Sequence, residues 1–107
     1  MLKKRYRALP RGVFNKSFAS RFFLLKIRDN GLLYSRFGFV ISKKIDKRAV
    51  VRNRLRRISS SCLEEIFDRI KQGYDMVFVV KKDMVGKNRK EILNSVSSLL
   101  AKEDFLK

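Results

Sequence analysis

Histidine and tryptophan are absent from this chain of 107 residues, and cysteine and proline each occur once. Without histidine there is no imidazole for general acid or base catalysis, and a single cysteine can form neither an internal disulfide nor a zinc finger. Cys62 is therefore expected to be a small core residue. No long hydrophobic run is present, since the longest early one covers residues 22–25, so we expect a mature cytoplasmic protein without a membrane span.

Acidic residues are scarce and unevenly placed. The chain has 27 Lys and Arg against 10 Asp and Glu, for a net charge of +17. Residues 1–58 hold 18 of the basic residues and only Asp29 and Asp46, whereas residues 59–107 are nearly neutral. Charge concentrated in one half is typical of a nucleic-acid-binding surface, which we favour over binding to an anionic membrane.

The length allows one domain, residues 1–107, with a single modest core. A flexible basic arm is expected first, followed by a possible short helix over residues 11–20, because Phe14 and Phe18 lie four residues apart. Residues 21–28 and 34–42 alternate as strands, and the turn signal between them predicts a hairpin. The residues expected to point into the core are Phe23, Leu25, Ile27, Phe37, Phe39 and Ile41.

The second half has helical periodicity. One apolar stripe predicts a helix over residues 46–72, with Asp46 as its N-cap and Gly73 after its end. The stripe consists of Val51, Leu55, Ile58, Cys62, Ile66 and Ile70. A buried strand over residues 75–81 and a last helix over residues 91–106 follow. The prediction is an α+β fold in the order α-β-β-α-β-α, a mixed sheet packed by helices.

The densest positive charge falls where the second strand leads into the long helix. Arginine pairs two phosphate oxygens at once and Asn53 offers both a donor and an acceptor, so this surface suits a folded RNA backbone. The alternative is a merely solvated basic helix face. The predicted RNA-binding residues are Lys43, Lys44, Lys47, Arg48, Arg52, Asn53, Arg54, Arg56 and Arg57.

Catalytic groups are missing from the same half. A metal nuclease needs clustered carboxylates, but Glu64, Glu65 and Asp68 are better explained as a solvated helical face. The chain is therefore expected to bind RNA while something else catalyses, with no catalytic and no metal-binding residue of its own. The simplest interpretation of three phenylalanines, Phe14, Phe18 and Phe22, is that they are core residues. Phe22, however, occupies an outward position in the strand alternation, so some aromatic surface should face single-stranded RNA.

Two motifs carry a family resemblance. Residues 38–44 read Gly-Phe-Val-Ile-Ser-Lys-Lys, and residues 52–57 read Arg-Asn-Arg-Leu-Arg-Arg. With the basic opening over residues 2–7, the Phe14 to Phe18 spacing and the strand that begins at Asp75, the chain resembles the protein subunit of bacterial ribonuclease P over nearly its whole length.

The resemblance implies a cofactor protein for a catalytic RNA that removes the 5′ leader from precursor tRNA, with Mg²⁺ bound mainly by the RNA. It implies that the arginine-rich helix docks on the ribonuclease P RNA and that a left-handed β-α-β crossover is present. No obligate protein partner is inferred. The open sheet face and the first helix would hold the single-stranded leader through Phe14, Phe18, Leu24, Lys26, Val40 and Ser42.

The sequence departs from the family pattern at two places. Serines at positions 59–61 stand where a further basic residue is usual, which would shorten the RNA footprint, and a short segment over residues 18–21 argues against an extra edge strand there. Two other readings stay open: a structural RNA-binding protein of the ribosome, and an enzyme that cleaves RNA alone.

Overall fold

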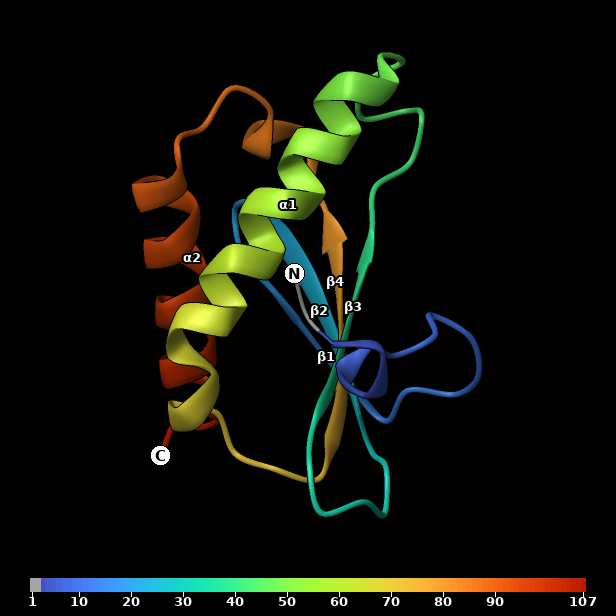
Figure 1. The fold of residues 1–107 in the computed structure, drawn as a ribbon, viewed down its shortest axis with the longest axis vertical. Coiled ribbons are helices and arrows are strands. Elements are labelled where there is room, and N and C mark those ends of the chain that lie inside the picture. The colour runs from blue at the N-terminus through green and yellow to red at the C-terminus, as the bar shows by residue number, and fades with distance from the viewer. Residues whose placement is uncertain (1–2) are drawn as a thin grey trace.

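Four strands form one mixed sheet in the computed structural model, which describes residues 3–107 (Figure 1). The strand order across the sheet is β1-β2-β4-β3. β4 is antiparallel to β2 and parallel to β3. The strands are β1 (Lys16–Ala19), β2 (Phe23–Asp29), β3 (Arg36–Val40) and β4 (Tyr74–Val80).

Two helices, α1 (Ala49–Ile66) and α2 (Arg89–Lys102), lie side by side over one face of the sheet (Figure 1). The Asn88 side chain caps α2 by accepting a hydrogen bond from the backbone N–H of Glu91. Short 3₁₀ turns occur at Lys4–Tyr6, Phe67–Arg69 and Lys82–Met84. The predicted α+β class, with helices packed on a mixed sheet, is confirmed.

The connection from β3 through α1 to β4 has unusual handedness. β3 and β4 are parallel neighbours, so α1 makes a crossover between them. With the helices toward the viewer and both strands running upward, β4 lies to the left of β3 (Figure 1). The crossover is therefore left-handed, as the family resemblance implied, although most such connections are right-handed.

The core fills the space between this helix face of the sheet and the two helices. Alternate strand residues point into it, and the cross-strand register aligns Phe23, Leu25 and Ile27 of β2 with alternate residues of β4. From α1 the predicted stripe supplies Leu55, Cys62 and Ile66, all buried. Cys62 is thus the core residue that the sequence predicted.

Two predictions about the first half are wrong. β2 and β3 do not form a hairpin, because β4 lies between them. Of the expected helix over residues 11–20, residues 16–19 instead form the edge strand β1, paired with β2 in the register Phe18 opposite Leu25. A spacing of four residues between two phenylalanines is compatible with a helix but does not require one, and here Phe14 precedes the strand while Phe18 lies in it.

The ends of the long helix also differ from the prediction. α1 begins after Arg48, and Asp46 accepts a hydrogen bond from the Arg48 backbone N–H two residues before the helix. The helix ends at Ile66, well before Gly73, which has a positive φ of 93° in the turn that leads into β4. Asp46 and Gly73 therefore stabilise turns near the helix rather than its ends.

The basic arm and Phe22 are also placed differently from the prediction. Residues 1–2 of the arm lie outside the described residues, but Ala8 is buried, and its backbone N–H donates to the Phe37 carbonyl of β3 at 2.8 Å. The arm is thus attached to the sheet edge. Phe22 was expected to point outward from a strand, but it lies just before β2 and is buried in the core cluster.

Candidate nucleic-acid interface

The first three turns of α1 expose one cationic face. Asn53, Arg54 and Arg57 are exposed, while Arg52 and Arg56 are half-exposed at the border of the buried stripe. This arrangement agrees with the helical wheel expected from the sequence, because Arg52 lies one turn before the buried Leu55 and Arg56 one turn before the buried Ser59 and Ser60. We call these five residues, together with the preceding Lys43, Lys44, Lys47 and Arg48, the cationic face.

Some of these side chains brace the structure and others do not. Arg52 donates from Nη1 to the carbonyls of Asp46 and Lys47 at 2.9 Å each, which fixes the loop before α1. Arg56 donates to Asn53 Oδ1 at 3.3 Å. Within the described chain, the side chains of Arg54 and Arg57 make no hydrogen bond or ion pair. Their guanidinium groups are therefore free to bind a ligand.

A carboxylate in the loop before α1, that of Asp46, pairs with this face. Arg48 forms an ion pair with Asp46, with Nη2 and Oδ2 2.9 Å apart. Hydrogen bonds from the Arg48 side chain and backbone lower the pKa of Asp46 to about 2. Asp46 is charged at neutral pH and partly neutralises Arg48, whereas Lys43, Lys44 and Lys47 remain exposed.

The face of the sheet opposite the helices is only partly covered, and we call it the open face. Leu24, Lys26 and Val40 point to this face and are half-buried. Ser42 is exposed just beyond the end of β3. The structure therefore places three of the six residues predicted to bind the leader on the open face, with Ser42 two residues beyond the end of β3.

Phe18 lies on the other side of the sheet. It stands opposite Leu25, whose side chain is fully buried, and its ring centroid lies 6.0 Å from that of Phe105. Because paired residues of neighbouring strands point to the same face, Phe18 packs on the core beneath the helices. The sequence misplaced it because a helix was expected at residues 11–20.

Phe14 lies close to the open face but not among the other predicted residues. The Arg28 Cζ atom sits 4.3 Å from the centroid of its ring, a cation–π contact. One face of the Phe14 ring is thus occupied by a side chain of the protein itself. Phe14 closes a segment, residues 8–14, that we call the N-terminal strap.

The strap crosses part of the open face. A Cβ atom at Gly38 would lie 2.6 Å from the Ala8 carbonyl oxygen, so β3 must have glycine where the strap passes over it. Val77, beside Gly38 in the register, is only 1% exposed although it points away from the helices. The strap therefore covers one half of the open face, and the half that carries Leu24 and Val40 stays accessible.

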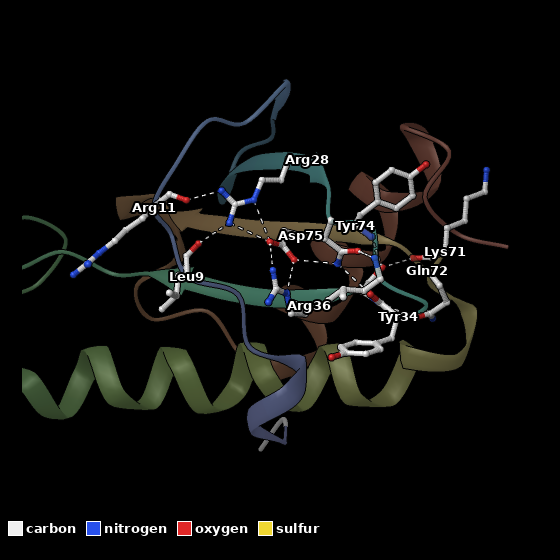
Figure 2. Close-up of polar contacts among 12 residues, drawn as sticks. Leu9, Arg11, Arg28, Tyr34, Arg36, Lys71, Gln72, Tyr74 and Asp75 are labelled. Carbon is white, nitrogen blue, oxygen red and sulfur yellow. Dashed lines mark hydrogen bonds and ion pairs between the residues drawn. The ribbon is translucent and has the colours of Figure 1, made fainter.

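A buried carboxylate beneath the strap was not foreseen from the sequence (Figure 2). Asp75 is 1% exposed and accepts two hydrogen bonds of 2.8 Å from Arg36. Arg28 donates from Nε at 3.1 Å and Asn30 from Nδ2 at 3.1 Å. The available signals were a single acidic residue at the start of an apolar strand and two arginines at outward strand positions.

The charge of Asp75 is held by these partners. Its burial acts to raise the pKa of the carboxyl group, but the hydrogen bonds from Arg36, Asn30 and Arg28 outweigh this effect. The pKa therefore lies below its usual value of 3.8. Asp75 is ionised at neutral pH, and the positive charges of Arg28 and Arg36 are directed inward.

The fold and the two surfaces together define a class of protein. The chain has a cationic helix face and a half-accessible sheet face that carries apolar and basic side chains. None of the helices within residues 3–107 is long and apolar enough to cross a membrane. These features are those of a small α+β RNA-binding protein.

Comparison with known proteins gives the particular family. The family model for ribonuclease P matches residues 3–104. The ribonuclease P protein component of Alkaliphilus oremlandii is 34% identical over 91 residues, which are 85% of this chain and 79% of the relative. That of Clostridium kluyveri is 37% identical over 94 residues, which are 86% of this chain and 83% of the relative.

Solved structures agree. The ribonuclease P protein of Thermotoga maritima aligns with a TM-score of 0.76 and 26% identity, covering 81% of this chain and 82% of that one. The protein of Staphylococcus aureus shares the fold, with a TM-score of 0.77 over 86% and 84% of the two chains, at 22% identity.

The chain belongs to the ribonuclease P protein family. It is the protein subunit of an endoribonuclease that acts in removal of the 5′ leader of tRNA, and it works with an RNA subunit. The comparisons give no support to the alternative of a ribosomal protein.

Proposed function

We propose that the cationic face docks this protein on the catalytic RNA of ribonuclease P. The observation that supports this role best is the freedom of Arg54 and Arg57, whose guanidinium groups project from α1 without a carboxylate partner in the described chain. Planar guanidiniums can bind two phosphate oxygens at once. Lys43, Lys44 and Lys47 extend the same positive field along the loop before the helix.

The accessible half of the open face receives the single-stranded leader of precursor tRNA. Leu24 and Val40 offer apolar contact to bases, while Lys26 and Ser42 can reach the phosphate backbone. Mature tRNA has no leader, so this contact adds affinity for the precursor only. The protein thereby favours substrate over product. We place this reaction in the cytoplasm.

Mg²⁺ is bound mainly by the RNA. Within residues 3–107 no three His, Cys, Asp or Glu side chains come together in a group that could hold a metal ion. Asp75 is enclosed by two arginines, and Asp46 is paired with Arg48. Both of these carboxylates are therefore already engaged by arginines.

Binding by the reconstituted holoenzyme tests this function. Lys26→Ala should weaken binding of precursor tRNA and leave binding of mature tRNA unchanged, because Lys26 lies on the open face. Lys102→Ala, at an exposed position at the end of α2, is the matched control and should change neither. Equal losses for precursor and mature tRNA with Lys26→Ala would contradict the assignment of the leader to the open face.

A further inference from the structure

Beyond the backbone hydrogen bond of Ala8 to β3, one side chain, that of Arg28, links the N-terminal strap to the sheet (Figure 2). Arg28 Nη1 donates to the carbonyl of Arg11, and Arg28 Nη2 donates to the carbonyl of Leu9 at 3.4 Å. The same guanidinium lies over the Phe14 ring. Arg28 therefore contacts the strap at three points along its length.

The position of Arg28 is fixed from below by Asp75. Arg28 Nε lies 3.1 Å from Asp75 Oδ2, and Arg36 and Asn30 hold the same carboxylate. The guanidinium faces Asp75 with Nε and Nη2, each 3.1 Å from Oδ2, and it faces the strap with Nη1 and with the second N–H of Nη2. This division of its five N–H donors makes Arg28 a clamp between β2 and the strap.

Gly12 shows how closely the strap approaches the clamp. A Cβ atom at Gly12 would lie 2.6 Å from Arg28 Nη1, and Gly12 has a positive φ of 94°. Both observations require glycine at this position. A side chain there would strain the strap and displace the guanidinium.

The clamp divides the open face into two parts. Along β2 the outward residues are Leu24, Lys26 and Arg28, a span of about 13 Å at roughly 3.3 Å per residue. At the Arg28 end Asp75 and Val77 are almost completely buried, whereas at the Leu24 end Val40 is half-buried. Only the second part can admit a ligand while the strap is in place.

We propose that Arg28, positioned by Asp75, determines how much of the leader the protein contacts. By clamping the strap, it confines the leader to the Leu24 and Val40 end of the open face. The inference rests on the proposed function, since it assumes that the leader binds this face. It adds a residue, Arg28, that limits the contact instead of making it.

The measurement is the affinity of the holoenzyme for precursor tRNA whose leader is lengthened one nucleotide at a time. For the wild-type protein the affinity rises with the first leader nucleotides and then stays constant, because the strap blocks further contact. When the clamp is removed, the rise continues to longer leaders. Each additional base that contacts the freed surface raises the affinity on the order of tenfold.

Two variants release the strap by different routes. Arg28→Met keeps the apolar stem and loses the hydrogen bonds to the strap, while Gly12→Ala changes the strap itself and leaves β2 intact. Gly86→Ala is the matched control, because Gly86 also has a positive φ, 83°, but no atom lies within 4 Å of its added Cβ. It carries the backbone strain without touching the clamp.

Limited proteolysis reports the state of the strap independently of RNA. Arg11 is exposed and is one of the two strap residues whose carbonyls accept hydrogen bonds from Arg28. Trypsin should cleave after Arg11 faster in Arg28→Met and Gly12→Ala than in the wild-type protein and Gly86→Ala. Unchanged cleavage in both clamp variants would show that Arg28 does not hold the strap and would overturn the inference.

The outcomes separate this inference from the proposed function. The inference is supported if the affinity for precursor tRNA keeps rising to longer leaders in both clamp variants but not in Gly86→Ala. If the strap is released but the affinity stops rising at the same leader length as in the wild-type protein, the inference is overturned and leader binding remains intact. A loss of affinity at every leader length in the clamp variants would also overturn the inference. If the wild-type affinity does not depend on the leader at all, the proposed function itself fails.

Discussion

Arginines in two regions of this protein have opposite roles. On α1, Arg54 and Arg57 are exposed and make no ion pair within the described residues. At the sheet, Arg28 and Arg36 converge on the buried Asp75. The net charge counts all four equally, but only the first pair can offer its full charge to RNA. The comparison shows that the distribution of carboxylates, rather than the number of arginines, decides where a basic protein binds a polyanion.

Removal of the buried carboxylate should have the largest effect. Asp75→Ala leaves two guanidiniums without their common partner, so the free energy of unfolding should fall by about 3–5 kcal/mol. Urea denaturation followed by circular dichroism measures this change. A loss below about 1 kcal/mol would mean that Arg28 and Arg36 do not depend on Asp75. The arginines at the sheet would then have no structural role that distinguishes them from those on α1.

The same carboxylate predicts a dependence on acid. Since the pKa of Asp75 in the folded protein lies below 3.8, its contribution to stability is complete above that value and is lost as the pH falls through the folded pKa. Stability should therefore be nearly constant from pH 7 to about 5 and then fall, and Asp75→Asn should flatten the fall. Asp46→Asn serves as the comparison, because Asp46 also has a low pKa but pairs with a single exposed arginine, Arg48, and should alter the curve less.

Phe18→Ala extends the comparison to aromatic residues. Phe18 packs against Phe105 on the helix face, so its removal should lower the free energy of unfolding by about 2 kcal/mol, less than for a fully buried phenylalanine. The preference of the holoenzyme for precursor over mature tRNA should be unchanged at a temperature where the variant is folded. A selective loss of precursor affinity would restore Phe18 to the leader site.

The free arginines should give a smaller effect, and on binding only. Arg54→Ala and Arg57→Ala should each weaken binding to the catalytic RNA by about 1–2 kcal/mol through loss of a charged hydrogen bond. Their melting temperatures should match the wild type, because neither side chain contacts the core. Lys102→Ala, on the opposite helix, controls for the loss of one positive charge. RNA affinity equal to the wild type in both arginine variants would remove α1 from the interface.

Local patterns in the sequence predicted much of this structure. Alternation placed Phe23, Leu25 and Ile27 on the core side of β2, and the helical period of α1 separated Leu55 and Cys62 from the exposed arginines. Both patterns succeed because a side chain's face is set by its immediate neighbours in the chain.

Features that depend on distant segments could not be found in this way. The hairpin was wrong because β4, which follows more than 30 residues after β3, inserts between β2 and β3. The Asp75 cluster joins residues 39 and 47 positions apart, for which no local signal exists. Phe18 was misassigned because its face depends on pairing with β2. The cationic face is local to one helix, and the open face is not.

The dependence of RNA binding on salt tests the central distinction most directly. Each phosphate contact contributes about 0.7–0.9 to the slope of log K against log salt concentration, because counterions are released. For binding to the catalytic RNA, Arg54→Ala should reduce this slope by about that amount, whereas Arg36→Ala, measured where it is folded, should leave the slope unchanged. An unchanged slope with Arg54→Ala, or an equal reduction with Arg36→Ala, would contradict the account.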